Sequence, residues 1–177
     1  MSIRQQYVAH GVERYYAEHS DAYANPHSEQ IAHLVRQHSR CWNPTDRILD
    51  LCCGDGIVTQ TLQLVGFNNI DGCDPFLYKQ YVLKTQRTCH KYNFADMARG
   101  DLTDTYDIII CSFALHLCPK DLLNVVLYQL ARIAPNLVVI SPSKKVLVDT
   151  FCWRPTCHTI YNRVHLRQFE RIGVCLC

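Results

Sequence analysis

Residues 47–62 read RILDLCCGDGIVTQTL, and this stretch decides how the rest of the chain is interpreted. The apolar run from Ile48 to Leu51 is typical of a buried strand, and Gly54 and Gly56 enclose a tight turn. Apolar side chains then recur at helical spacing. Strand, glycine turn and helix in this order open a nucleotide-binding βαβ unit, because the glycines let a ligand approach the backbone and the helix start offers free N–H groups.

Length and composition indicate one globular domain. The chain has 177 residues, enough for a sizeable core, and 48% of them are hydrophobic. The net charge of +2 is too small to argue by itself for a nucleic-acid partner. Apolar runs fall well short of the roughly 20 residues that cross a membrane, and the first residues lack a signal-peptide core. We therefore expect a cytoplasmic protein without a membrane partner.

The eleven cysteines predict neither a disulfide framework nor a metal site. Several stand at the ends of expected buried strands, where cysteine acts as a small hydrophobic residue. The pairs nearest to a zinc pattern, Cys152 with Cys157-His158 and Cys175 with Cys177, have poor ligand spacing. We expect no metal, and free thiols in a reducing compartment.

Strand and helix signals alternate along the chain. Strands are expected at 47–51, 69–73, 91–94, 106–111 and 137–140, and helices at 3–19, from Ser28 as cap, after Gly56, at 76–88 and at 121–133. Residues 161–169 and 172–177 leave no room for a helix between them and are expected to pair as an antiparallel hairpin. The sequence therefore predicts an α/β fold, a doubly wound, Rossmann-like, mostly parallel seven-stranded sheet with a terminal antiparallel hairpin, in three α/β/α layers.

Acids stand at three of the expected strand ends, where doubly wound sheets bind their ligands. Asp50 precedes the glycine turn and is placed to orient an amino group of the ligand. Asp74 follows Gly54 by about 20 residues, the interval at which an acid accepts both hydroxyls of a ribose. Asp96 is placed to accept from an adenine amino group. Singly, Asp50 could cap a turn and Asp74 could form an Asx turn before Pro75, but their succession points to a ligand.

The order DLCCGDG, Asp74, Asp96-Met97 and YDIIICSFALHL resembles the class I S-adenosylmethionine-dependent methyltransferases over residues 45–142. Their first motif is commonly D/E-x-G-x-G-x-G, and here Cys52 stands at the first glycine, a place that small residues can take. The resemblance implies S-adenosylmethionine as cofactor. It assigns the methionine part to Asp50, Cys52, Gly54 and Gly56, the ribose to Asp74 with Pro75, the adenine to Asp96 and Met97, and the edge near the sulfonium to Ser112 and Phe113. One methyltransferase domain would then cover 1–177, with an N-terminal helical lid segment at 1–44, the cofactor-binding core at 45–142 and C-terminal strands at 143–177.

Two rival interpretations are weighed against this resemblance. An NAD-dependent Rossmann enzyme also has glycines and a later acid, but its strand usually runs directly into the first glycine, whereas Asp50 precedes Gly54 by four residues. GDGIVT also lacks the third glycine or alanine of the dinucleotide fingerprint. A methyltransferase-like binding subunit with an inert site is the other alternative, and the intact strand-end acids argue against it.

The catalytic side of the sequence is less informative. A methyl sulfonium is already reactive, so that a protein mainly has to align the acceptor and exclude water. His116, after the fourth strand, is the candidate general base, although it can equally pack under the following helix. In this family the segment before the first strand often closes over the cofactor. The candidates for substrate and lid contacts are Tyr15, Tyr23 and His27, with Tyr16 also considered for catalysis; the helical tyrosines can instead be core residues.

The methyl acceptor is either a small molecule, which is slightly favoured, or a macromolecule. The chain lacks an insertion that could form a separate substrate domain. It also lacks the Asn/Asp-Pro-Pro-Tyr/Phe motif of adenine amino methylation, extra metal-binding acids near the fourth strand, and the Pro-Cys pair of pyrimidine methyltransferases. A nucleic-acid acceptor stays open because the C-terminal part is mildly basic, although a solvated face is the more frequent outcome. Its basic residues are Lys144, Lys145, Arg154, Arg163, Arg167 and Arg171.

Overall fold

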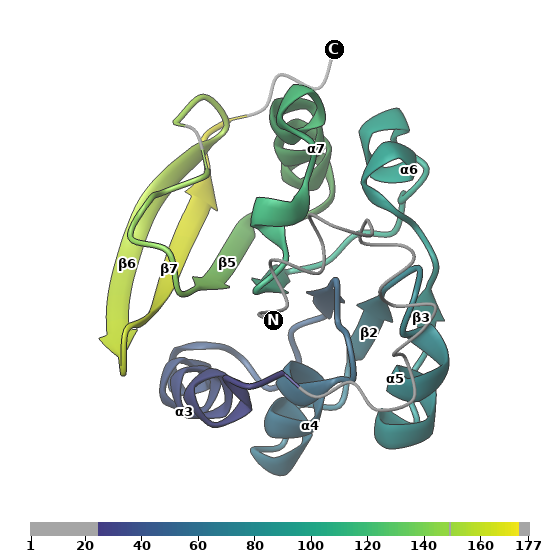
Figure 1. Ribbon diagram of the computed structural model, residues 1–177, viewed down its shortest axis with the longest axis vertical. Coiled ribbons are helices and arrows are strands. Elements are labelled where there is room, and N and C mark those ends of the chain that lie inside the picture. The colour runs from purple at the N-terminus through teal and green to yellow at the C-terminus, as the bar shows by residue number, and fades with distance from the viewer. Residues whose placement is uncertain (1–24, 149, 174–177) are drawn as a thin grey trace, which may run out of the picture.

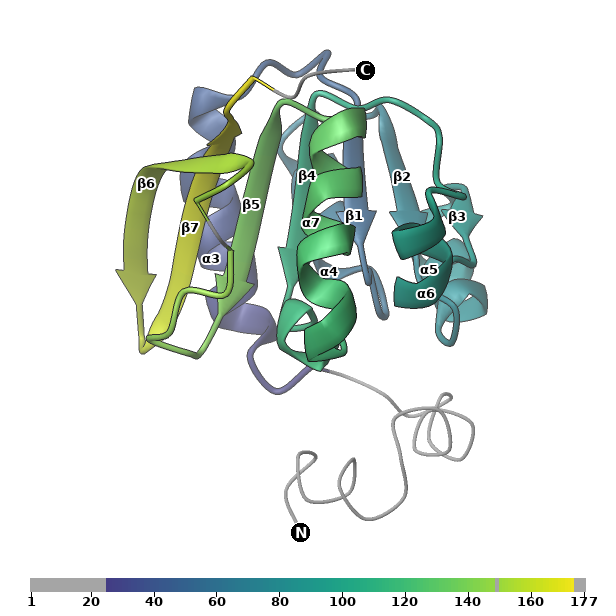
Figure 2. The same cartoon turned by 90° about the horizontal axis from the view of Figure 1, so that it is seen from above.

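The computed structural model describes residues 25–148 and 150–173. The helix expected at 3–19 and the strand expected at 172–177 lie wholly or mostly outside these residues. The described chain forms a seven-stranded sheet between two layers of helices (Figures 1 and 2). The expected Rossmann-like architecture, with three layers and antiparallel strands at the end, is confirmed.

The sheet has the strand order β3-β2-β1-β4-β5-β7-β6. Strands β1 to β5 run parallel, whereas β7 is antiparallel to both β5 and β6. The strands are β1 (Ile48–Leu51), β2 (Ile70–Cys73), β3 (Cys89–His90), β4 (Ile108–Ser112), β5 (Asn136–Ser141), β6 (Trp153–Tyr161) and β7 (Val164–Arg171). The chain leaves β1 toward β2 and returns to β4 on the other side of β1. The strand order therefore reverses between β1 and β4, which opens a crevice at their carboxyl ends.

The helices cover both faces of this sheet. They are α3 (Ser28–His38), α4 (Ile57–Leu64), α5 (Tyr78–Thr85), α6 (Phe94–Arg99) and α7 (Lys120–Ile133), with 3-10 turns at Ser39–Cys41 and Leu115–Leu117. Figures 1 and 2 show α6 and α7 on one face and α3, α4 and α5 on the other. Parallel strands covered on both faces need apolar side chains at most positions, which explains the mostly apolar strand segments in the sequence, interrupted by Asp50 in β1 and Asp71 in β2.

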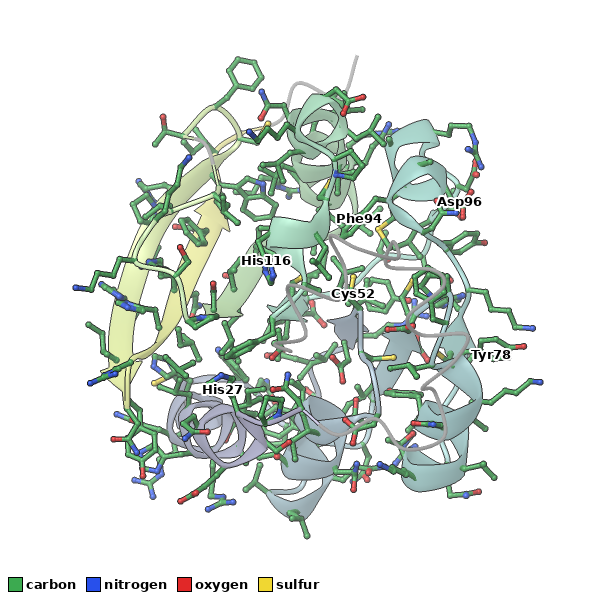
Figure 3. All side chains as sticks on the ribbon, viewed as in Figure 1. His27, Cys52, Tyr78, Phe94, Asp96 and His116 are labelled. Carbon is green, nitrogen blue, oxygen red and sulfur yellow. The ribbon has the colours of Figure 1, made fainter. Side chains whose placement is uncertain are left out.

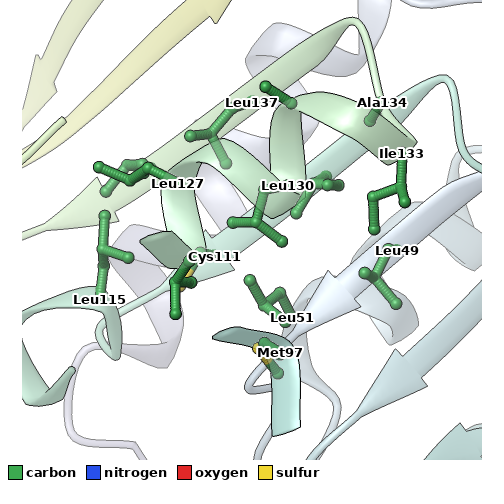
Figure 4. Close-up of a cluster of buried hydrophobic side chains, with 14 of the residues drawn as sticks. Leu49, Leu51, Met97, Cys111, Leu115, Leu127, Leu130, Ile133, Ala134 and Leu137 are labelled. Atoms are coloured by element: carbon green, nitrogen blue, oxygen red, sulfur yellow. The ribbon is translucent and has the colours of Figure 1, made fainter. Parts of the chain in front are cut away.

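Alternate residues of β1 and β4 enter two different cores. Leu49 and Leu51 join the core under α7, together with Leu127 and Leu130 of that helix (Figure 4). Ile48 packs in the second core, under α3 and α4. Asp50 shares the face of Ile48, because side chains two residues apart on a strand point the same way. The carboxyl of Asp50 is therefore directed toward the helix that follows the glycine turn.

The expected third strand at 91–94 is wrong. Strand β3 contains only Cys89 and His90, and Asn93 instead caps helix α6. Oδ1 of Asn93 accepts hydrogen bonds from the backbone N–H groups of Ala95 and Asp96, and Asp96 accepts from the backbone N–H of Asn93. This capping box satisfies N–H groups at the helix start. The local side-chain bonds favour a helix where the short apolar run suggested a strand.

The expected bounds of the terminal hairpin are also wrong. The hairpin pairs β6 with β7, and Tyr161 lies opposite Val164 across a two-residue turn. Asn162 and Arg163 in this turn both have positive φ, 46° and 67°, as a tight turn between right-twisted strands requires. The turn does not carry the usual Asn-Gly pair, and a bulge between Pro155 and Cys157 interrupts the alternation of β6. Both features hide the hairpin in the sequence.

Two helix boundaries differ from expectation. Ser28 belongs to the first turn of α3 and is not its cap, because the N-cap position is His27 and the Ser28 hydroxyl donates to the carbonyl of Asn25. Helix α5 is shorter than the expected 76–88, since Gln86 adopts a left-handed conformation and ends it. Both differences leave the order of elements unchanged.

Gly72 in β2 is required by a ring that packs on it. A Cβ at this position would lie 2.5 Å from Cζ of Tyr81, which is fully buried on α5. A Cβ at Gly56 would lie 3.2 Å from Cδ2 of the same ring and 2.6 Å from Cγ2 of Thr85. The two glycines thus allow α5 to pack closely against β2 and the glycine turn.

We expect Gly72→Ala to lower the free energy of unfolding by about 1–3 kcal/mol, because the added methyl group overpacks a site that has no free space. Urea unfolding measures the change. Gly173→Ala is the matched control, since nothing lies within 4 Å of a Cβ added there. Equal losses in the two variants would contradict this account of the ring and the strand.

Candidate active site

A cavity of about 320 Å³ lies at the carboxyl ends of β1, β2 and β4. Four segments line it: Cys52 and Gly54 of the glycine turn; Asp74, Pro75 and Phe76 after β2; Tyr92–Ala95 and Met97 around the start of α6; and Ser112–Ala114, Leu117, Pro119 and Leu122 between β4 and α7. Figure 3 labels Cys52 and Phe94, which belong to two of these segments. The cavity occupies the crevice that the reversal of strand order predicts.

Asp50 joins the end of β1 to the first turn of α4. Its Oδ2 accepts the backbone N–H of Thr59 at 3.2 Å and the Thr59 hydroxyl at 2.8 Å. Its Oδ1 is buried and has no hydrogen-bond partner among the described residues, and the same holds for the hydroxyl oxygen of Ser112 on the cavity wall. Buried polar atoms are normally paired. The unpaired oxygen of Ser112 lies on the cavity wall, whereas Asp50 does not line the cavity and stands two residues before the lining residue Cys52.

Acidic groups make this end of the sheet suited to a cation. Burial, together with the nearby carboxyls of Asp74 and Asp55, raises the pKa of Asp50 to about 8, although the two hydrogen bonds from Thr59 lower it. Burial also raises the pKa of Asp74, while three backbone N–H bonds lower it. Asp55 is paired with Lys84 at 2.9 Å. A positively charged ligand beside Asp50 would favour its ionised form.

Asp74 orders the glycine turn and the chain after β2. Its Oδ2 accepts the backbone N–H of Gly54 at 3.1 Å, and its Oδ1 accepts those of Phe76 and Leu77, both at 2.8 Å. The alternative weighed from the sequence, an Asx turn before Pro75, is therefore present. Asp74 and Pro75 nevertheless both line the cavity, so the turn keeps this carboxylate at the cavity wall.

Asp96 does not line the cavity, whereas its neighbour Met97 does. The Asp96 carboxylate accepts the backbone N–H of Asn93 and forms an ion pair with Arg99, and both interactions lower its pKa. The structure thus gives the carboxylate a structural task at the start of α6, which speaks against the predicted contact with adenine.

Sequence reasoning missed the aromatic part of the lining. Phe76, Tyr92 and Phe94 all face the cavity. Tyr92 and Phe94 were assigned to a strand and therefore not considered. The capping-box spacing of Asn93 and Asp96 is the signal that would have placed a helix start, and hence these side chains, at the cavity.

The predicted contacts near the sulfonium lie on the opposite wall. Ser112 and Phe113 line the cavity, and the ring of His27 stacks on Phe113 with 4.9 Å between the ring centroids. Cys52 and Phe113 both adopt positive φ, 55° and 56°, although neither is glycine. Such strained backbone is concentrated at ligand sites. These two residues follow β1 and β4, the strands that flank the crevice.

The candidate catalytic and lid residues do not line the cavity or lie outside the described residues. His116 is exposed in the 3-10 turn Leu115–Leu117 and does not line the cavity, although the adjacent Leu117 does. Tyr15, Tyr16 and Tyr23 lie outside the described residues. His27 therefore represents the proposed lid segment within the structure, at the edge of the cavity beside Phe113.

The cysteines near the cavity are free thiols; Cys53 and Cys73 are buried, whereas Cys52 and Cys89 are partly exposed. A hydrogen bond with Cys111 and burial raise the pKa of Cys52 well above its usual range, and burial raises that of Cys73. The sulfur atoms of Cys53 and Cys89 lie 3.7 Å apart. Across residues 25–148 and 150–173, no three His, Cys, Asp or Glu side chains gather in a way that could hold a metal ion.

The chain belongs to a family of methyltransferases. The family model for a methyltransferase domain matches residues 4–168, and the resemblance to the class I enzymes is thereby confirmed. An uncharacterized protein of the fission yeast Schizosaccharomyces pombe is 27% identical to this chain in an alignment that spans 229 positions. The alignment covers 96% of this chain and 92% of the relative. No helix in the described part of the chain is long and apolar enough to cross a membrane.

Two solved structures illustrate the shared fold. Magnesium protoporphyrin IX methyltransferase from Synechocystis PCC 6803, with bound S-adenosylmethionine, superposes with a TM-score of 0.66 at 16% identity, over 96% of this chain and 95% of that one. A protein of Pyrococcus horikoshii OT3 gives 0.69 at 13% identity, over 97% of this chain and 100% of that one. At such identities the likeness concerns the fold.

The raised pKa of Asp50 has a consequence for stability. The side chain ionises near pH 4 in the unfolded chain and near pH 8 in the folded protein. Folding therefore loses stability as the pH rises from about 4 to about 8, and above that range the loss is constant. Asp50→Asn removes this titration. We expect the variant to gain roughly 2–5 kcal/mol relative to the wild type between pH 5 and pH 9, measured by urea unfolding.

Asp101→Asn is the control for this measurement, because Asp101 lies on the surface with a side chain that is 41% exposed. Its difference from the wild type should change little over the same range. A difference between Asp50→Asn and the wild type that stays constant from pH 5 to pH 9 would refute the assigned titration.

Proposed function

We propose that this protein transfers a methyl group from S-adenosylmethionine to a small molecule with an apolar surface. The observation that carries the proposal is the cavity beside the glycine turn, with the unpaired hydroxyl oxygen of Ser112 on its wall and the unpaired Oδ1 of Asp50 buried two residues before the lining residue Cys52. Methyl transfer is the activity of the family to which the chain belongs. The cofactor and the acceptor class follow from the fit of the residues around this cavity.

The residues present suit each part of this cofactor. Oδ1 of Asp50 is available to the ammonium group, and Asp74 presents a carboxylate on the wall where the ribose hydroxyls are expected. Tyr92, Phe94 and Met97 offer apolar surface for the adenine. A surplus of acids suits a ligand that carries positive charge on sulfur and nitrogen. Our proposed cofactor contacts are thus Asp50, Asp74 and the apolar surface of Tyr92, Phe94 and Met97. Ser112 and Phe113 are expected near the methyl group.

When bound, S-adenosylmethionine supplies a methyl group activated by a positively charged sulfur. The protein then has to hold the acceptor in line and keep water away. Phe113, Leu117 and Leu122 form an apolar wall that can do both, and His27 packs on Phe113 from outside. His116 stays our candidate base for an acceptor that is protonated at working pH, because it adjoins Leu117. Tyr16 stays a prediction as well.

The acceptor class is inferred from the cavity wall and the basic residues. The wall beside α7 is apolar, which suits a molecule with an apolar face. Three of the six basic residues in the C-terminal part are engaged within the fold: Arg167 donates to the carbonyls of Ser143 and Lys144, Arg171 to that of Ala131, and Arg154 pairs with Glu170. Their engagement weakens the case for a nucleic-acid acceptor. By its name, the Synechocystis relative acts on a porphyrin, which is also a small molecule.

Calorimetry tests the cofactor. We expect the wild type to bind S-adenosylmethionine and S-adenosylhomocysteine, and Asp74→Asn to weaken binding about tenfold or more, because a carboxylate that accepts hydrogen bonds is replaced by an amide that is half donor. Asp101→Asn, at a surface residue that does not line the cavity, should bind like the wild type. A folded wild type that binds neither compound would exclude the proposal, and binding of NAD instead would support the dinucleotide interpretation.

Transfer of a labelled methyl group tests the acceptor. Cell extract incubated with the protein and methyl-tritiated cofactor should acquire label in the small-molecule fraction, and Asp74→Asn should reduce it in proportion to the lost affinity. Label in protein or RNA would contradict the small-molecule acceptor. Cofactor binding without any transfer would favour the inert binding subunit.

A further inference from the structure

A chain of hydroxyl groups connects the Asp50 carboxyl to helix α5. The Thr59 hydroxyl donates to Oδ2 of Asp50 at 2.8 Å, and Oη of Tyr81 lies 2.9 Å from the Thr59 hydroxyl oxygen. Because the single hydroxyl proton of Thr59 is directed at Asp50, the Tyr81 hydroxyl is the donor in the second bond. Three elements therefore meet in one network: the end of β1, the first turn of α4 and the middle of α5.

Packing fixes the donor end of this network. The Tyr81 ring is fully buried and lies against Gly72 and Gly56, where a Cβ would approach its atoms to 2.5 and 3.2 Å. Burial and the Asp50 charge raise the pKa of Tyr81 far above its usual range, so its hydroxyl keeps its proton. Tyr81 is thus a permanent donor on an immobile ring.

The network leaves the two Asp50 oxygens in different states. Oδ2 accepts two bonds from Thr59, whereas Oδ1 has no partner among the described residues. The carboxyl cannot rotate without giving up both bonds to Thr59. Its orientation, with one oxygen bonded within the fold and the other buried without a partner among the described residues, is therefore set by Thr59 and, behind it, by Tyr81.

We propose that Tyr81 is a positioning residue for the cofactor: acting through Thr59, it holds the Asp50 carboxyl so that Oδ1 meets the ammonium group of S-adenosylmethionine. This inference rests on the proposed function. Tyr81 has no contact with the ligand in this scheme. It also favours the ionised form of Asp50, because each donor in a buried chain strengthens the next.

The other charged groups near Asp50 are the same in the wild type and in the variants that remove one hydroxyl, so they cannot cause a difference between them. The titratable groups that act on it or feel its charge are Asp74 after β2, Asp55 in the glycine turn with its partner Lys84, the Cys53 thiol and Tyr81 itself. Removing one hydroxyl leaves the first four in place. A change in the pH dependence of ligand affinity is then attributable to the loss of the hydroxyl chain.

Tyr81→Phe removes the hydroxyl and keeps the ring on Gly72. Calorimetry with S-adenosylhomocysteine between pH 6 and 8.5 provides the test. In the wild type, affinity should rise with pH and level off near pH 8, as Asp50 ionises. In Tyr81→Phe we expect binding weaker by roughly 3–30-fold at pH 7 and a rise that continues to pH 8.5.

Companion variants and a second ligand separate positioning from packing. Thr59→Ser keeps the hydroxyl and should retain the wild-type profile, whereas Thr59→Val breaks the chain from its other end and should reproduce the effect of Tyr81→Phe. Methylthioadenosine, which lacks the amino-acid part, should bind equally to the wild type and Tyr81→Phe and show no rise with pH.

The outcomes distinguish this proposal from the one it rests on. An unchanged pH profile in Tyr81→Phe, with only a lowered melting temperature, would overturn the positioning role and leave the cofactor assignment intact. An equal loss of methylthioadenosine affinity would also overturn it, because the effect would then be a general packing defect. If the wild type bound no adenosyl ligand at any pH, the proposed function itself would fail.

Discussion

The buried Asp50 carboxyl is the constraint on which this site depends. Placing a carboxyl between a strand and a helix costs free energy unless hydrogen bonds compensate it. Thr59 supplies two such bonds from the first turn of α4 and thereby fixes the helix start relative to β1. The glycine turn between them has to be short and sharp, and Asp74 closes it from β2. A single unfavourable burial thus determines how three segments meet around the cavity.

The order of elements could be predicted because it follows from hydrophobic pattern and glycine placement. The parallel strands are mostly apolar segments, and the reversal between β1 and β4 puts Cys52 and Ser112 beside one another at the crevice. The predictions failed where local side-chain bonds or a bulge override the pattern. Asn93 caps α6 where a strand was expected, and the bulge before Cys157 conceals the long strand β6.

The sequence could place a residue at the cavity where the position of the backbone alone decides that placement. Asp74 stands at a strand end that the topology brings to the cavity, so its position in the sequence predicted its place on the cavity wall. Asp96 was placed by the same rule on a strand that does not exist there, and its carboxylate serves the capping box instead. Thr59 and Tyr81 gave no signal at all. Their importance comes from hydroxyl groups that meet in three dimensions, and no spacing along the chain reports that.

The contact between Gly72 and Tyr81 also constrains how such a chain can diverge. A side chain at position 72 would occupy the space of the ring, and without the ring the hydroxyl behind Thr59 disappears. Neither position can change alone without loss, although one lies on a strand and the other on a helix. Homologous chains should therefore vary at the two positions together: those with a larger residue at position 72 should lack the aromatic ring at position 81 and must orient the acid at the end of β1 by other means.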